Sequence, residues 1–268
     1  LIFVLILFKV SAHADESKPH FNVYDALIYD HKPDLTAYGL KNLTMLNHIH
    51  FWEKGKTRDN VPLKRNISTY LSNISIEDLV VVNVEHWSLN NISDMVENIP
   101  KYNRTFKLIK DIVGDKKVGI YSMFPQRNYW ASQKFPPNQK YTDWQKKNNE
   151  LADIVVDADI VMPSLYTFYP GKRGWVRYAK THIKESRRLF PNKPVYVFLW
   201  PQYHYSNLLH GGKYIDGEFW RLQLQTAYQN ADGIIIWGGW DDVSKKHLDW
   251  SNNWDWWQET IKFVSELK

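Results

Sequence analysis

Short apolar runs alternate with stretches of helical periodicity along most of the chain, and this alternation constrains the fold more than any other feature. Seven runs end in polar or aromatic residues and predict strands over 21–28, 45–52, 79–87, 117–124, 160–168, 195–203 and 233–240. Four stretches with apolar residues three and four apart predict helices over 102–113, 144–156, 175–190 and 219–231. Strands that are apolar on both faces and alternate with helices indicate an α/β fold with a parallel sheet.

The number of these units favours a closed barrel over an open, doubly wound sheet, because a (β/α) barrel needs about 250 residues. An open sheet that binds nucleotides is expected to carry a glycine-rich turn after its first strand, and residues 29–33 contain no glycine. No linker, internal repeat or low-complexity tract divides the chain. We therefore predict one domain, a distorted TIM-like (β/α) barrel of about seven to eight strands over residues 15–268.

The start of the chain has the pattern of a secretion signal. Residues 1–8 are apolar, and Ala12 and Ala14 supply the small residues of a signal-peptidase site. The apolar run is much shorter than the roughly 20 residues of a membrane span. We expect residues 1–14 to be a fragment of a signal peptide, and the protein to be secreted and extracellular without a stable membrane anchor. A buried N-terminal strand is the alternative.

Five Asn-x-Ser/Thr acceptor sites agree with secretion, although some can arise by chance. The predicted glycosylation sites are Asn42, Asn66, Asn73, Asn91 and Asn103. The chain has no cysteine, which excludes disulfides and Cys-ligated metal sites. The net charge of +5 permits an anionic polymer as partner but does not select one.

The run over 79–87 carries the strongest candidate for catalysis. Active sites of (β/α) barrels lie at the carboxyl ends of the strands, and Asn83 and Glu85, two residues apart, point to the same face there. A carboxyl group walled by Trp and Tyr would have a raised pKa and could act as a general acid near neutral pH. The alternative is that Glu85 only pairs with a Lys or Arg at the end of the strand.

Ordinary glycosidases need a second carboxylate at a defined separation from the acid. Asp241 and Asp30 could approach Glu85 from other strand ends. In the other route, the acetamido oxygen of an N-acetylhexosamine attacks its own anomeric carbon. A side chain beside the acid must then hold the acetamido N–H, and Asn83 is placed to do so.

Several segments of the chain together resemble a known family. The chain resembles the hyaluronidase family, whose members have a distorted TIM-like barrel and cut hyaluronan with retention by substrate assistance. The matching segments occur in order over nearly the whole mature chain: Phe21-Asn22-Val23-Tyr24, Val61-Pro62 with Asn66-Ile67-Ser68, Asn83-Val84-Glu85-His86-Trp87, Gly119-Ile120-Tyr121 with Phe124-Pro125, Met162-Pro163-Ser164-Leu165-Tyr166, and Asp232-Gly233-Ile234-Ile235-Ile236-Trp237-Gly238.

The resemblance implies roles for single residues. Glu85 matches the acid/base, Tyr121 and Trp237 match aromatic residues that shape the acetamido pocket, and Tyr166 lies in the strand whose tyrosine lines the cleft. Read without the family, Tyr166 and Trp237 could be barrel-core aromatics. We add Asp241 as a further substrate-binding residue.

Two positions depart from the family pattern. Asn83 replaces an aspartate, which removes a negative charge beside the acetamido group, and Pro201 replaces a tyrosine in the sixth strand. A phenol at that place would have to come from Tyr203, or a polar group from His204. We therefore expect Tyr203 to bind substrate.

The prediction is an endo-β-N-acetylhexosaminidase of hyaluronidase type that acts on an anionic glycosaminoglycan of the hyaluronan or chondroitin type. We expect a monomer that needs no cofactor or metal and binds no nucleic acid. His48 and His50 share a strand face without an identifiable third ligand. Two alternatives stay open: a weakly active or inactive barrel that binds anionic glycans like a lectin, and a two-carboxylate glycosidase.

Overall fold

The computed structural model describes residues 21–52, 61–133 and 138–267. The predicted signal segment, residues 1–14, lies outside the described residues. None of the helices in the described ranges is long and apolar enough to cross a membrane.

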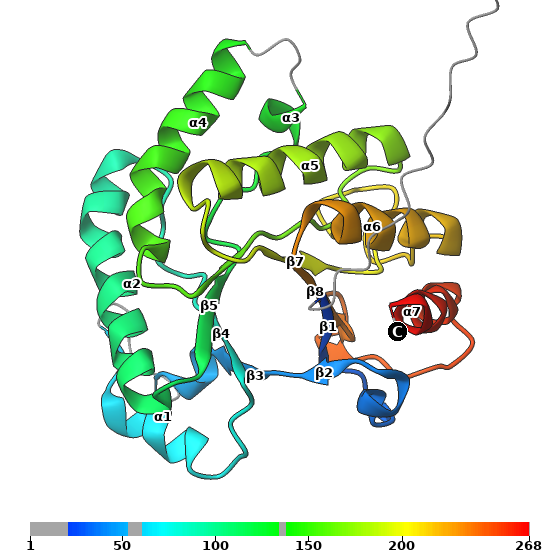
Figure 1. Cartoon of the computed structure of the whole chain (residues 1–268), viewed down its shortest axis with the longest axis horizontal. Helices are drawn as coiled ribbons and strands as arrows, with labels where there is room; N and C mark the ends of the chain where they lie inside the picture. Colours follow the sequence, from blue (N-terminus) through cyan, green and yellow to red (C-terminus); the bar gives the residue numbers. More distant parts are fainter. Residues whose placement is uncertain (1–20, 53–60, 134–137, 268) are drawn as a thin grey trace, which may run out of the picture.

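Parallel strands form the centre of the molecule and helices surround them (Figure 1). The strands of the two parallel sheets are β1 (Asn22–Leu27), β2 (Lys41–Asn42), β3 (Thr44–Asn47), β4 (Leu79–Asn83), β5 (Lys117–Tyr121), β6 (Ile160–Met162), β7 (Tyr196–Leu199) and β8 (Gly233–Gly238). They pair in the orders β2-β1-β8-β7 and β3-β4-β5-β6.

The two sheets join into a ring. Only Leu43 separates β2, which pairs with β1, from β3, which pairs with β4. On the opposite side, bridges from Val161 to Val195 and from Ser164 to Phe198 connect β6 to β7. The strand order is therefore circular, and the predicted α/β, TIM-like barrel is confirmed.

Helices cover the outside of the strands, and a small hairpin follows the last barrel strand (Figure 1). The helices are α1 (Lys64–Leu71), α2 (Ile92–Val113), α3 (Tyr129–Ser132), α4 (Gln139–Leu151), α5 (Lys172–Leu189), α6 (Gly217–Asn230) and α7 (Asp255–Glu266). The hairpin strands are β9 (Trp240–Asp241) and β10 (Lys246–His247), which are antiparallel.

Several predicted elements have different bounds in the structure. The strands predicted over 79–87, 117–124, 160–168 and 195–203 end earlier, at Asn83, Tyr121, Met162 and Leu199, and the helix predicted over 144–156 spans Gln139–Leu151. Helix α2 begins at Ile92 rather than at residue 102, and it continues through Pro100, a residue that usually ends a helix. Asn91 starts this helix by accepting a hydrogen bond from the Asp94 N–H. The prediction of a strand through residue 52 was wrong, because residues His48–His50 form a 3₁₀ helix.

Alternate residues of the strands belong to two different apolar layers. Val81 packs inside the barrel, whereas Val80 and Val82 pack between the strands and the helices. Asn83 continues the inward-facing series of Val81, so the polar end of β4 opens at the mouth of the barrel. This alternation explains why β4 is apolar on both faces.

Candidate active site

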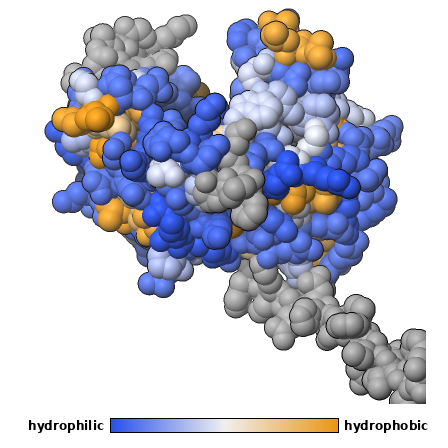
Figure 2. Space-filling model, turned by 90° about the horizontal axis from the view of Figure 1, so that it is seen from above, coloured by the Kyte–Doolittle hydropathy of each residue, from blue (hydrophilic) through white to orange (hydrophobic). Residues whose placement is uncertain are grey.

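A cleft of about 910 Å³ lies over the carboxyl ends of the strands. In space-filling view the surface is hollowed between two lobes (Figure 2). Five residues predicted for catalysis or substrate binding line this one cleft: Asn83, Glu85, Tyr121, Tyr166 and Trp237. They come from β4, β5, β8 and the segments after β4 and β6, so the barrel brings together residues up to about 150 positions apart in sequence.

Glu85 presents its carboxyl group to the cleft, two residues after the end of β4. Desolvation by the surrounding protein raises the pKa of this carboxyl group, although the charge of Arg127 and a hydrogen bond from Asn83 lower it. Among the described residues, no Lys or Arg forms an ion pair with Glu85. The alternative that Glu85 is a strand-end ion-pair residue has no support in this geometry.

Asn83 is fixed by the neighbouring strand. Its Nδ2 donates a hydrogen bond of 3.1 Å to Oδ1 of Asn47, the residue opposite it in the β3–β4 register. The Oδ1 atom of Asn83 is buried and accepts no hydrogen bond from the described residues. A buried amide oxygen without a donor is unusual and costs about 1 to 3 kcal/mol.

Aromatic rings form one wall of the cleft. Tyr166 stacks on Trp237 with ring centroids 5.9 Å apart, and Trp200 meets Trp237 edge-on at 4.9 Å. The hydroxyl groups of Tyr121 and Tyr166 are hydrogen-bonded, and burial raises the pKa of both phenols. Both tyrosines therefore keep their protons and can act as neutral hydrogen-bonding groups at neutral pH.

Two predicted substrate-binding residues do not line this cleft. Tyr203 is buried and packs against His210. Asp241 lies in a neighbouring hollow, where it accepts hydrogen bonds from Tyr205 and from the Val243 and Ser244 N–H groups. The hydrogen bonds from Ser244 and its neighbours lower the pKa of Asp241 to about 2, so this group is a permanent anion.

The structure places no unpaired second carboxylate beside Glu85 among the described cleft residues. Asp30 lies near His247, 3.2 Å from Nδ1, and does not line the cleft. Asp25 and Asp242 line it, but Asp25 pairs with Lys32 and Asp242 pairs with Lys245.

Sequence reasoning missed several cleft residues, among them Arg127, Trp200 and Tyr205. Arg127 follows the Phe124–Pro125 pair after β5, and only its position a few residues past a strand end could have indicated it. Of the two residues considered as substitutes at Pro201, it is His204 that enters the cleft. Burial and the nearby Arg127 charge lower the pKa of His204 to about 4, so its ring is neutral near pH 7.

The two histidines His48 and His50 sit on the 3₁₀ helix after β3. The His50 ring stacks on Tyr70 with centroids 3.7 Å apart. In the described part of the chain, no three His, Cys, Asp or Glu side chains cluster as a metal site would require. Of the two, His50 lines the cleft.

The five acceptor asparagines occupy different surroundings. Asn42 and Asn73 are exposed, whereas Asn66 is half-buried and donates a hydrogen bond to the Phe51 carbonyl. Asn91 caps α2 and Asn103 lies within it. A glycan on Asn66 would replace one hydrogen of the Nδ2 group that donates to Phe51.

Comparison with known proteins supports the fold. No family model and no curated protein sequence matches this chain. Bee venom hyaluronidase, in complex with a hyaluronic acid tetramer, has a similar structure with a TM-score of 0.59 and 15% identity, over 92% of this chain and 96% of that one. A GH18 chitinase from Pseudoalteromonas aurantia is similar with a TM-score of 0.50 and 12% identity, over 87% of this chain and 78% of that one. The chain thus has the barrel fold found in these glycoside hydrolases.

Proposed function

We propose that this protein is a glycoside hydrolase that cleaves a β-linked N-acetylhexosamine polymer of the hyaluronan or chondroitin type. The observation that carries the proposal is the Glu85 carboxyl group, which has a raised pKa and lies beside Asn83 in a cleft lined by aromatic rings. Aromatic rings suit such a polymer because their flat apolar faces stack on sugar rings. We further propose that the protein is secreted as a glycosylated monomer.

In the first step, protonated Glu85 donates its proton to the glycosidic oxygen as the bond to the anomeric carbon breaks. The acetamido oxygen of the same sugar forms a new bond to that carbon, which gives a cyclic oxazolinium ion. The leaving sugar departs with the transferred proton as its new hydroxyl group. Glu85 is then a carboxylate.

In the second step, the Glu85 carboxylate removes a proton from water, and the oxygen of that water attacks the anomeric carbon. The carbon–oxygen bond of the oxazolinium ring breaks and restores the acetamido group. Two inversions at the same carbon give net retention, and Glu85 regains its proton. No second protein carboxylate is needed.

Asn83 would orient the acetamido group. In the structure its Nδ2 faces Asn47. Half a turn of both amides keeps a hydrogen bond between them with donor and acceptor exchanged. The Asn83 oxygen then takes the place of Nδ2, which donates toward Glu85 in the structure. An acetamido N–H can then donate to that oxygen, which positions the acetamido oxygen for attack.

The structural neighbours add support of a general kind. One is a hyaluronidase in complex with a hyaluronic acid tetramer, and the other is a GH18 chitinase. The similarity is in fold, and the substrate assignment rests on the residues of the cleft.

Reducing-end release from hyaluronan, chondroitin and chitin oligosaccharides, each with and without its N-acetyl groups, tests the proposal. Substrate assistance predicts cleavage of an acetylated polymer and none of its de-N-acetylated form. Equal cleavage of both forms would instead establish a two-carboxylate mechanism. Binding of a polymer without any cleavage would contradict the proposal and establish a lectin-like protein.

A further inference from the structure

Arg127 is a cation in the cleft without an anionic partner. Its side chain is exposed, and no carboxylate in the described ranges forms an ion pair with it. It is also the one Arg or Lys among the described residues that line the cleft. Its guanidinium carbon lies 5.5 Å from the centre of the Phe168 ring, which holds the group at the wall.

The position of Arg127 relative to Glu85 links it to the reacting part of the cleft. Its positive charge lowers the pKa of the Glu85 carboxyl group and also that of His204. Arg127 and Glu85 line the same cleft, so a polymer bound at the proposed acid can also reach the guanidinium group.

The backbone just before Arg127 is clamped on both sides. The N–H of Gln126 donates a hydrogen bond of 2.9 Å to Oδ1 of Asn148, and its carbonyl accepts one of 2.7 Å from Nε1 of Trp144. Nε2 of His182 lies 3.2 Å from the same carbonyl oxygen. Asn148, Trp144 and His182 are almost fully buried, so they cannot turn away.

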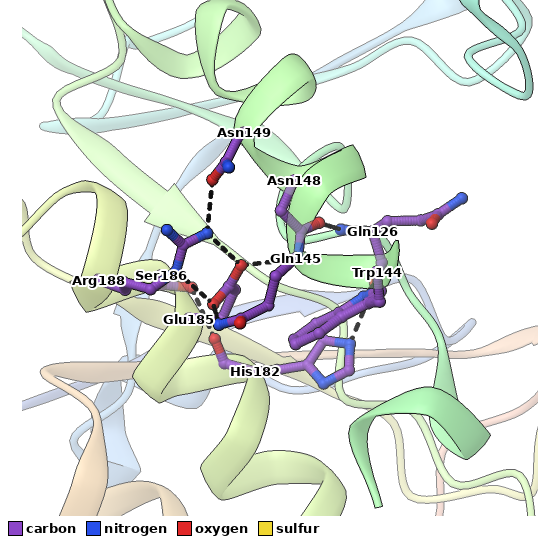
Figure 3. A network of polar contacts seen from close by, with 9 residues as sticks. All are labelled: Gln126, Trp144, Gln145, Asn148, Asn149, His182, Glu185, Ser186 and Arg188. Carbon is purple, nitrogen blue, oxygen red and sulfur yellow. Dashed lines mark hydrogen bonds and ion pairs between the residues drawn. The ribbon is translucent and has the colours of Figure 1, made fainter. Parts of the chain in front are cut away.

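We call Asn148, Trp144 and His182 the Gln126 clamp. Glu185, a residue of α5, joins α5 to α4 beside this clamp (Figure 3). Its buried carboxylate accepts hydrogen bonds from Asn148 Nδ2 at 3.0 Å and Gln145 Nε2 at 2.9 Å, and it pairs with Arg188 at 2.7 and 2.8 Å. Burial opposes the charge of this group, but these donors hold the pKa of Glu185 below its usual range. The network is fully satisfied and therefore rigid.

We propose that Arg127 binds the carboxylate of an acidic sugar in the polymer and thereby determines specificity, and that the Gln126 clamp positions it. A guanidinium group presents parallel N–H donors that match a carboxylate in a bidentate pair. A fixed backbone reduces the entropy lost when the pair forms. This inference rests on the proposed function, because it names the part of the substrate that the same cleft recognises.

The test compares hyaluronan oligosaccharides with the same oligosaccharides after reduction of their carboxylates to neutral hydroxymethyl groups. Wild type is expected to prefer the acidic form at least about tenfold in kcat/KM and in affinity. Arg127→Gln is expected to abolish this preference, because it weakens binding of the acidic ligand and leaves the affinity for the neutral ligand unchanged. Arg127→Lys should retain part of it.

Arg177→Gln is the matched control, because it removes the same charge from an exposed arginine outside the cleft. Trp144→Phe tests the clamp, since it removes the donor to Gln126 and keeps an aromatic ring. It should reduce the preference for the acidic form while the affinity for the neutral form stays at the wild-type value. Each variant is measured at its own pH optimum, because Arg127 also affects the pKa of Glu85.

A preference that survives in Arg127→Gln would overturn the inference. An equal loss of kcat/KM for acidic and neutral ligands would also overturn it, because Arg127 would then act only through Glu85. The affinity measurements separate the inference from the proposed function. If wild type cleaves nothing but Arg127→Gln still loses the preference in binding, the glycosidase proposal fails and the inference holds.

Discussion

Nδ2 of Asn83 and Oδ1 of Asn47 are joined by a hydrogen bond of 3.1 Å across the β3–β4 pair. This contact fixes the side chain that lies next to the proposed acid, and it leaves the Asn83 oxygen buried and without a donor. Half a turn of both amides would bring the Asn83 oxygen to the place of Nδ2 beside Glu85, where substrate assistance requires an acceptor for the acetamido N–H.

Two substitutions of Asn83 should change kcat in opposite directions. Asn83→Ala removes the acceptor for the acetamido N–H and is expected to lower kcat by about 100-fold, with little change in KM. Asn83→Asp places a negative charge beside the oxazolinium ion and should raise kcat. It should also raise the pKa of Glu85, so the fall of kcat occurs at higher pH. Asn73→Asp, at an exposed position, is the control, and equal kcat values for all the proteins would contradict the role of Asn83.

The ionised Glu85 carboxylate is expected to lower the free energy of unfolding at high pH. Its pKa is raised in the folded protein, so the folded state binds more protons than the unfolded state between the two pKa values. Stability should therefore fall as the pH rises through the folded-state pKa. Glu85→Gln keeps the shape without the charge and should be more stable than wild type at pH 8, with a smaller difference at pH 4.5. Urea unfolding of both proteins measures this, and an unchanged difference between the two pH values would refute it.

His182 should make the protein sensitive to acid. Burial lowers the pKa of this imidazole to about 4, so the unfolded chain binds a proton between pH 6.5 and 4 that the folded chain does not. As the pH falls from 6.5 to 4, the free energy of unfolding should therefore decrease, and this group contributes about 3 kcal/mol to the decrease. His182→Gln should flatten the dependence, even if its stability at pH 7 is lower. A wild-type slope in His182→Gln would count against this explanation.

Gly239 should tolerate no side chain. It has a φ of +98°, and a Cβ atom there would lie 2.5 Å from the backbone nitrogen of Tyr29. Gly239→Ala is expected to lower the free energy of unfolding by about 2 to 3 kcal/mol, because both the strain and the clash involve backbone. It should also displace Trp240, which lines the cleft, and raise KM. Gly171→Ala is the control, since a Cβ atom there meets nothing within 4 Å.

The sequence predicted the barrel and much of the cleft because both depend on local patterns. The apolar runs indicated where the strands lie. The two-residue spacing of Asn83 and Glu85 predicted that both face the cleft, although β4 ends at Asn83 and Glu85 lies in the segment after it. Tyr121, Tyr166 and Trp237 could be added because the family resemblance covers β5, β8 and the segment after β6, which carry them. All five line one cleft in the structure.

The residues that the sequence did not reveal depend on loops, where side-chain direction has no period. Arg127 enters the cleft because Gln126 is clamped by side chains from α4 and α5, far away in sequence. His204 enters it whereas Tyr203, its neighbour, turns into the protein. Asp241 faces the turn of its own hairpin, a choice decided by the Val243 and Ser244 N–H groups rather than by its nearness to a strand end.

The central claim is that Glu85 is the acid and base of a glycosidase. Reducing-end release from hyaluronan by wild type and Glu85→Gln, between pH 4 and 8, tests it most directly. The account predicts release by wild type that falls as the pH rises through the raised pKa of Glu85, and none by the variant although it still binds the polymer. Equal release by the two proteins would contradict the account.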